Sequence, residues 1–276
     1  MKFPKISLHN HTCYCDGENT PEEMVLAAIE ADVETIGFSG HSCTSFDLSY
    51  CMTRENTAKY REEILRLREK YRDRIQILLG IERDFYADPD DAPYDYAIGS
   101  VHYIIADDGA ICAIDESREI VLRDVKEHFG GNIYRWTRRY YETLAHVVEK
   151  TNCNVVGHFD LVRKYNGDGT LFDSELPDYR LAVLDAMEAL TETGVIFEIN
   201  TSAVKAGGRR TPYPSPDILD WLARHGAKTI ITSDAHRAGD ILFGFEDAAL
   251  YAKSCGIGGF TVPRNGKWVT VPIGRE

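Results

Sequence analysis

The 276-residue sequence lacks any long run of hydrophobic residues. No stretch approaches the roughly 18 consecutive apolar residues that a membrane-spanning helix needs. The N-terminal segment MKFPKISLHN also lacks the long apolar region of a secretory signal peptide. We therefore expect a cytoplasmic protein that does not contact membranes.

The sequence is also poor in positive charge. Lys and Arg total 31 against 44 Asp and Glu, which gives a formal net charge of −13. Proteins that bind nucleic acids or anionic membranes usually present a strongly basic surface, so we expect neither partner. Divalent ions held in one pocket would still attract a small anionic ligand, because bound cations dominate the local electrostatics.

A disulfide framework is missing as well. The 7 cysteines are an odd number at irregular spacings, which is typical of reduced thiols. Cys13, Cys15 and Cys43 are near candidate metal ligands in the sequence, but we interpret them as small, partly buried thiols. Internal repeats and low-complexity linkers are absent too, so the length suits one large α/β domain or two small ones.

What the sequence does contain is a regular alternation of apolar runs and helical patterns, typical of repeated β–α units around a parallel sheet. A capping box at Thr20 predicts a helix that runs to Ala31. Apolar residues at helical spacing predict further helices over 54–72, over 181–190 and after Ser215. Seven candidate strands span residues 5–11, 34–41, 75–82, 96–104, 153–159, 194–201 and 228–235.

Residues of the metal-binding types lie at the downstream ends of these strands. His9 and His11 are two positions apart, as are Asp234 and His236, so each pair points to one side of its strand. A barrel gathers the C-terminal ends of its strands at one mouth, and a metal there would offset the cost of burying Glu82. The candidate ligands are His9, His11, Asp16, His41, Glu82, His102, His158, Asp234 and His236, whereas His128, His146 and His225 lie on predicted helices and are interpreted as structural.

Two segments exceed the needs of a minimal barrel. Residues 106–142 are rich in charged and aromatic side chains, and we interpret part of this segment as a lid, because loops at the C-terminal rim of a barrel usually carry function. Residues 203–215 contain Gly207-Gly208-Arg209-Arg210. Their concentrated positive charge predicts contact with a phosphate group.

Six motifs lie at the ends of the predicted strands: His9-Asn10-His11 with Asp16, Gly40-His41-Ser42, Gly80-Ile81-Glu82, Gly99-Ser100-Val101-His102, Gly157-His158-Phe159-Asp160 and Ser233-Asp234-Ala235-His236. In this order, they resemble the motifs of the polymerase-and-histidinol-phosphatase (PHP) superfamily. The similarity covers most of the chain, and the stretches GHFDLVRKY and EINTSA look most like its histidinol-phosphate phosphatases. The resemblance implies an α/β fold, a distorted (β/α)7 barrel, as a single domain over residues 1–276.

The resemblance further implies three divalent metal ions. Zinc, manganese and iron all suit mixed imidazole and carboxylate ligands. In the implied mechanism a hydroxide bridging two ions, held by Glu82, His102, His158 and Asp234, attacks the phosphorus atom. The implied ligand sets are His9, His11, Glu82 and Asp234 for one ion, Glu82, His102 and His158 for a second, and Asp16, His41 and His236 for a third.

The expected reaction is hydrolysis of a small phosphate monoester, and the resemblance favours L-histidinol phosphate, a step of histidine biosynthesis. Arg163, Lys205 and Arg209 are candidates to bind the phosphate. Asp160 and Asn200, together with Asp115 and Glu198, are candidates for the amine and imidazole. Two alternatives remain at this stage: a PHP enzyme acting on nucleotides or other small phosphoesters, and a non-catalytic PHP module. The oligomeric state is not predicted.

Overall fold

The computed structural model describes residues 3–205 and 209–274, so Gly207 and Gly208 of the predicted phosphate-binding loop lie outside the described residues. Seven strands form one sheet in the order β1-β2-β3-β4-β7-β8-β9, and all neighbouring pairs are parallel. The strands of this sheet are β1 (Ile6–Ser7), β2 (Thr35–Phe38), β3 (Gln76–Asp84), β4 (Tyr96–Ser100), β7 (Val155–Val156), β8 (Ile196–Asn200) and β9 (Lys228–Thr232).

The sheet curls until its first and last strands nearly meet. Just beyond the ends of β1 and β9, the His11 amide donates to the Ala235 carbonyl at 2.8 Å, and the Ala235 amide donates to the His9 carbonyl at 3.0 Å. This contact almost closes the sheet into a barrel. The seven-stranded α/β barrel predicted from the sequence is therefore confirmed.

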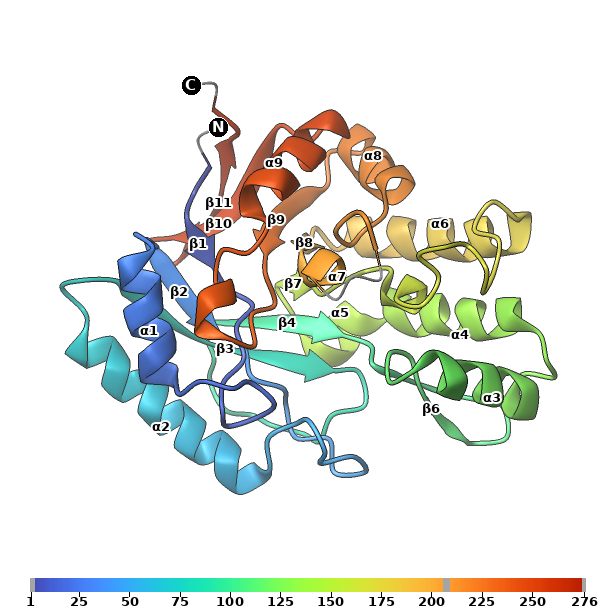
Figure 1. Ribbon diagram of the computed structural model, residues 1–276, viewed down its shortest axis with the longest axis horizontal. Helices are drawn as coiled ribbons and strands as arrows, with labels where there is room; N and C mark the ends of the chain where they lie inside the picture. Colours follow the sequence, from blue (N-terminus) through green and yellow to red (C-terminus); the bar gives the residue numbers. More distant parts are fainter. Residues whose placement is uncertain (1–2, 206–208, 275–276) are drawn as a thin grey trace.

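Helices cover the outside of the barrel (Figure 1). Figure 1 shows α1 and α2 together at one end of the molecule and α3, α4 and α6 together at the other. The predicted capping box is present, because Thr20 accepts a hydrogen bond from the Glu23 amide and Glu23 accepts one from the Thr20 amide. The helices are α1 (Pro21–Glu30), α2 (Arg54–Lys70), α3 (Arg118–His128), α4 (Ile133–Ala145), α5 (Val147–Thr151), α6 (Pro177–Glu192), α7 (Ser202–Lys205), α8 (Pro216–Arg224) and α9 (Phe245–Ser254).

The segment after β4 folds into an insertion rather than a loop. It begins with the hairpin of β5 (Tyr103–Ile105) and β6 (Ile111–Ala113) and continues through α3 and α4. Trp136, Tyr140 and Tyr141 of α4 are buried, and the Tyr141 hydroxyl lies 2.8 Å from that of Tyr179 on α6. The aromatic side of α4, in the segment that we interpreted as containing a lid, is thus packed into the molecule.

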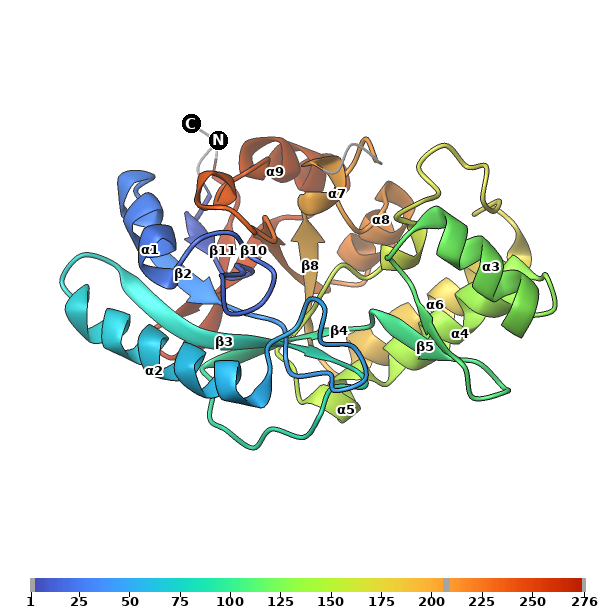
Figure 2. The same ribbon diagram turned by 60° about the horizontal axis from the view of Figure 1, so that its bottom comes forward.

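A C-terminal hairpin, which the sequence reading did not predict, covers the seam between the first and last strands of the barrel. It consists of β10 (Gly259–Arg264) and β11 (Lys267–Pro272), and it lies beside β1 in Figures 1 and 2. Phe260 and Val262 of β10 belong to one buried apolar cluster with Ile6 of β1 and Ile230 of β9. The hairpin therefore seals the gap where β1 and β9 lack a regular hydrogen-bonded ladder.

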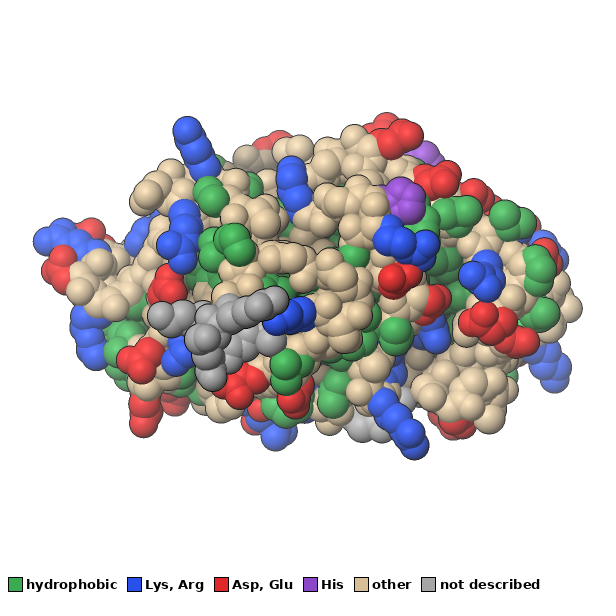
Figure 3. All heavy atoms as spheres, turned by 90° about the horizontal axis from the view of Figure 1, so that it is seen from above, with side chains coloured by type: hydrophobic (Ala, Val, Ile, Leu, Met, Phe, Trp, Pro, Cys, Tyr) green, Lys and Arg blue, Asp and Glu red, His purple; other side chains and the backbone are tan. Residues whose placement is uncertain are grey.

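The surface carries mixed charge. On the face shown in Figure 3, basic and acidic side chains are interspersed. Within the described residues, no helix combines the length and the apolar character needed to cross a membrane.

Candidate metal centre

The nine residues predicted as metal ligands converge at the C-terminal ends of the barrel strands. They come together because every strand of the sheet runs in the same direction, so all these ends meet at one mouth. His41 is also joined to Glu82 through a parallel backbone bridge that extends the pairing of β2 with β3. By contrast, His128, His146 and His225 lie at the ends of α3, α4 and α8.

The first donor group is formed by His9, His11, Glu82 and Asp234. His9 Nε2 lies 3.2 Å from Glu82 Oε2 and 3.5 Å from Asp234 Oδ1. His11 Nε2 lies 3.5 Å from Glu82 Oε2 and 3.1 Å from Asp234 Oδ1. Tetrahedral coordination with bonds of 2.0–2.1 Å places donor atoms about 3.3 Å apart. The spacing of these four atoms therefore suits a single ion between them.

A second donor group uses the other oxygen of the same carboxylate. Glu82 Oε1 lies 3.2 Å from His158 Nε2 and 3.6 Å from His102 Nε2. The two oxygens of Glu82 thus face two different sets of imidazoles, which is the geometry of a bridging ligand. His41 Nδ1 also lies 2.9 Å from Glu82 Oε2, so His41 touches this carboxylate as well.

The third donor group surrounds Asp16. Asp16 Oδ2 lies 3.2 Å from His236 Nε2 and 3.6 Å from His41 Nε2, and Asp16 Oδ1 lies 3.6 Å from His11 Nδ1. The sulfur of Cys15 is 3.6 Å from the same His11 nitrogen. This thiol therefore contacts the imidazole of a candidate ligand.

Several donor atoms lack hydrogen-bond partners among the described residues, as expected of atoms that bind a metal ion. His9 Nε2, His11 Nε2 and Glu82 Oε2 are buried and have no hydrogen-bond partner among the described residues. Burying polar atoms without partners is costly, and coordination of a cation removes that cost. Imidazole and carboxylate donors are also the ligands that divalent transition metals prefer.

Burial and neighbouring charges prepare the centre for cations. Burial raises the pKa of the Glu82 carboxyl, but the imidazoles of His41 and His9 outweigh burial and hold that pKa well below its usual value. Burial, together with the nearby imidazoles of His236 and His41, lowers the pKa of His11 to about 4. The carboxylate is therefore ionised and the His11 ring neutral near pH 7, as metal ligands must be.

Buried carboxylates lie beside the Nδ1 atoms of two of these imidazoles. Glu198 lies 2.5 Å from His9 Nδ1 and accepts hydrogen bonds from the Thr232 hydroxyl at 2.6 Å and the His158 amide at 2.6 Å. Asp84 accepts from the His102 amide at 2.8 Å, and its Oδ2 is 3.3 Å from His102 Nδ1. Such partners leave the Nε2 atom of each ring free to face an ion.

We expected Glu198 to contact the substrate, and we did not predict a role for Asp84. A signal for Asp84 was present, because it follows Glu82 by two positions and therefore lies on the same face of β3.

A cavity of about 430 Å³ opens above the donor groups. Within residues 3–205 and 209–274, Lys164 is the one Lys or Arg that lines it, and its ammonium donates to Asp115 Oδ2 at 2.9 Å and to the Asp115 carbonyl at 3.0 Å. Asp115, one of the predicted substrate contacts, also lines the cavity. Lys164 therefore provides the positive charge of the cavity wall.

The 3₁₀ turn η1 (Leu161–Arg163) explains why Lys164, and not Arg163, faces the cavity. Side chains at positions i and i+3 of such a turn lie on the same side. Leu161 and Lys164 accordingly both line the cavity, whereas Arg163 lies on the other side with Asp160 at 3.9 Å and Asp217 at 3.5 Å.

The other predicted phosphate contacts also lie away from the cavity lining. The Arg209 guanidinium is 4.5 Å from the centre of the Tyr213 ring and donates to Asp160 at 3.2 Å, so it supports the wall formed by Tyr213 from behind. Lys205 pairs with Asp240. Among described residues, neither Lys205 nor Arg209 lines the cavity.

Asp160 and Asn200, which we expected to contact the substrate, are fully buried. Asp160 accepts hydrogen bonds from Arg209 and, at 3.1 Å, from the Ser215 amide. The Asn200 amide group donates to Asp234 Oδ2 at 3.1 Å and to Glu198 Oε2 at 3.0 Å. The geometry thus places Asn200 behind a candidate ligand and not in the cavity.

Comparison with known proteins gives consistent results. Residues 7–202 match the family described as PHP domain. The chain is 28% identical to the probable histidinol-phosphatase of Deinococcus radiodurans, covering 92% of this chain and 94% of that protein. It is 26% identical to the histidinol-phosphatase of Bacillus subtilis, covering 86% of this chain and 96% of that protein.

A solved structure supports the same fold. The histidinol phosphate phosphatase from Lactococcus lactis, complexed with zinc, L-histidinol and phosphate, superposes with a TM-score of 0.74 at 24% identity, covering 97% of this chain and 100% of the other. The family match spans most of the barrel and includes seven of the nine candidate ligands, from His9 to His158. The chain therefore belongs to the PHP domain family.

Proposed function

We propose that this protein is a metal-dependent histidinol-phosphatase, which hydrolyses L-histidinol phosphate to L-histidinol and phosphate in histidine biosynthesis. The observation that carries the proposal is the cavity of about 430 Å³, with candidate metal ligands at its base and Lys164 in its wall. The substrate itself follows from the relatives, several of which bear the name histidinol-phosphatase.

We further propose three divalent ions, one for each donor group. The base of the cavity suits them because Glu82 supplies one oxygen to each of two groups. Zinc is the first choice, since the Lactococcus lactis enzyme was solved with zinc, although manganese and iron accept the same donors. Bound ions of this kind supply activated water and neutralise the charge of a phosphate ester.

Other side chains of the protein bind the substrate, orient the metal ligands and line the cavity. Lys164 binds a non-bridging phosphate oxygen, and Asp115 holds the ammonium in position until the substrate arrives. Glu198 and Asp84 keep the imidazoles of His9 and His102 oriented toward the ions. Tyr213 and Leu161 line the cavity and limit the access of bulk water.

Steady-state kinetics with three substrate types tests the proposal. The substrates are L-histidinol phosphate, a nucleoside monophosphate and 4-nitrophenyl phosphate, with metal content measured on the same sample. Histidinol phosphate should exceed the aryl phosphate by at least about a hundredfold in kcat/KM, because a site with polar groups for a substrate penalises ligands that leave them unpaired.

Comparable efficiency on the aryl ester, or a preference for the nucleotide, would replace the proposal with a general PHP phosphoesterase. No turnover of any ester by metal-loaded protein would favour a non-catalytic module. A metal content of one ion per chain or less after reconstitution would overturn the three-ion assignment.

A further inference from the structure

The outer wall of the cavity carries more negative than positive charge. Besides the candidate metal ligands, the charged residues that line it within residues 3–205 and 209–274 are Asp47, Asp115, Glu116 and Lys164. Three carboxylates thus face one ammonium. A substrate with further anionic groups beyond its phosphate would be repelled by this wall, whereas one with a positively charged tail would be attracted.

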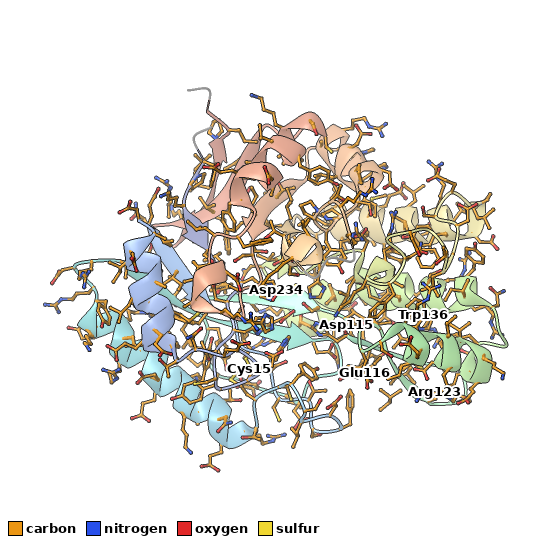
Figure 4. The ribbon with its side chains drawn as sticks, viewed as in Figure 1. Cys15, Asp115, Glu116, Arg123, Trp136 and Asp234 are labelled. Carbon is orange, nitrogen blue, oxygen red and sulfur yellow. The ribbon has the colours of Figure 1, made fainter. Side chains whose placement is uncertain are left out.

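The insertion after β4 brings two of these carboxylates to the mouth of the barrel. Tyr103 of β5 pairs with Ala113 of β6, and the Ile114 amide donates to the His102 carbonyl at 2.8 Å. The residues that follow, Asp115 and Glu116, therefore leave the hairpin beside a candidate metal ligand. Figure 4 labels both on the side of the centre that faces the insertion.

Only one of the three wall carboxylates is uncommitted among the described residues. Asp115 receives the Lys164 ammonium at 2.9 Å. Asp47 accepts from the Tyr103 hydroxyl at 2.7 Å and from the Ser49 hydroxyl at 2.6 Å. Glu116 is exposed at the rim and forms no hydrogen bond or ion pair with a side chain of residues 3–205 and 209–274.

Two aromatic rings complete the wall. Tyr50 and Tyr103 both line the cavity, with ring centroids 6.2 Å apart. The Tyr50 ring also contacts the His41 ring edge-on at 4.8 Å. Tyrosine faces attract cations and stack against planar rings, so this pair forms a surface beside the metal centre that suits a cationic aromatic group.

We propose that Glu116, together with Tyr50 and Tyr103, recognises the positively charged tail of the substrate and selects phosphate monoesters that carry a cation. This inference rests on the proposed function only in naming the tail as the amine and imidazole of histidinol. The phosphate occupies the base of the cavity beside Lys164, and the tail lies along the two tyrosines toward Glu116.

Glu116→Gln tests the proposal, because it removes the charge and keeps the shape of an exposed side chain. The expected result is a fall of about 5- to 20-fold in kcat/KM for L-histidinol phosphate, the effect of losing one partly exposed charge-assisted contact. The variant should hydrolyse 4-nitrophenyl phosphate with wild-type efficiency. Glu116→Asp, which retains the charge, should recover part of the loss.

Glu188→Gln is the matched control, since Glu188 is an exposed carboxylate on α6 that forms no side-chain hydrogen bond or ion pair within the described residues. It should leave kcat/KM for both substrates unchanged. Equal losses on both substrates in Glu116→Gln would overturn the proposal, because they would show a general defect of the site. Unchanged efficiency on histidinol phosphate would overturn it as well.

A second substrate pair separates this inference from the proposed function. If the wild type does not hydrolyse histidinol phosphate, aminoethyl phosphate and ethyl phosphate still test the role of Glu116. The readout is the ratio of kcat/KM of the wild type to kcat/KM of Glu116→Gln for each ester, because differences between the leaving groups cancel in this ratio. A larger ratio for the aminoethyl ester would support selection of cationic substrates by Glu116, even if histidinol phosphate is not the substrate. Equal ratios would reject the wall.

Discussion

At the scale of single residues, Glu82 is the candidate ligand that lies between two donor groups. It is 1% exposed and its two oxygens face different groups of imidazoles. We predict that Glu82→Gln reduces kcat by at least about a hundredfold and lowers the metal content, because one anionic donor shared by two ions is lost. Circular dichroism should show an intact barrel. Wild-type turnover at matched metal content would show that Glu82 does not bridge two ions.

Lys164 provides a second test at this scale. Replacing it with Met should lower kcat/KM. The corresponding loss of transition-state stabilisation should be about 1.5–3 kcal/mol, the usual contribution of a hydrogen bond to a charged group. Arg163→Ala should have a much smaller effect, because Arg163 faces Asp217 and not the cavity. A larger loss for Arg163 than for Lys164 would restore the assignment that the sequence analysis made.

These two neighbours also show what sequence reasoning can and cannot reach. The nine candidate ligands could be named because strand ends in a parallel barrel converge, whatever the details of the loops. Whether Arg163 or Lys164 faces the cavity depends on where the three-residue turn η1 begins. No periodicity in the sequence indicates this position. The roles of Asp160 and Asn200 were missed for the same reason, since burial decides them.

At the scale of elements, the insertion is the feature that most changes the expected barrel. Trp136 of α4 is fully buried, so we predict that Trp136→Ala lowers the free energy of unfolding by about 3–5 kcal/mol. Trp136→Phe should cost less, because it leaves a smaller cavity and removes an indole N–H that lacks a partner among the described residues. Urea denaturation measures both. A mobile lid would instead give lower activity with unchanged stability.

The strands of the barrel itself could be predicted from the sequence. Each of the seven strands lies within or close to its predicted range, because apolar runs between helices leave few alternatives. The predicted strand over 96–104 is divided at Val101 and His102 into β4 and β5. The hairpin of β10 and β11 was not predicted, since its role is to cover a seam that exists only once the barrel has formed.

At the scale of the whole molecule, the buried centre links stability to metal. Several strand ends contribute buried atoms that have no hydrogen-bond partner among the described residues, such as His9 Nε2 and Glu82 Oε2. A ligand that binds only the folded state stabilises it by an amount that grows with its concentration over Kd, about 4 kcal/mol at a thousandfold excess. Metal and fold should therefore be strongly coupled in this protein.

We predict that chelation lowers the Tm of the protein and that added zinc restores it, as differential scanning calorimetry would show. The restored increment should be smaller in Glu82→Gln, because two donor groups share this carboxylate, and unaffected in Glu188→Gln. The donor groups draw on strands from both ends of the sheet, with His9 beyond β1 and Asp234 beyond β9. We expect ions bound there to hold closed the seam that the backbone closes only partly, so a Tm unaffected by chelation would mean that the barrel does not need them.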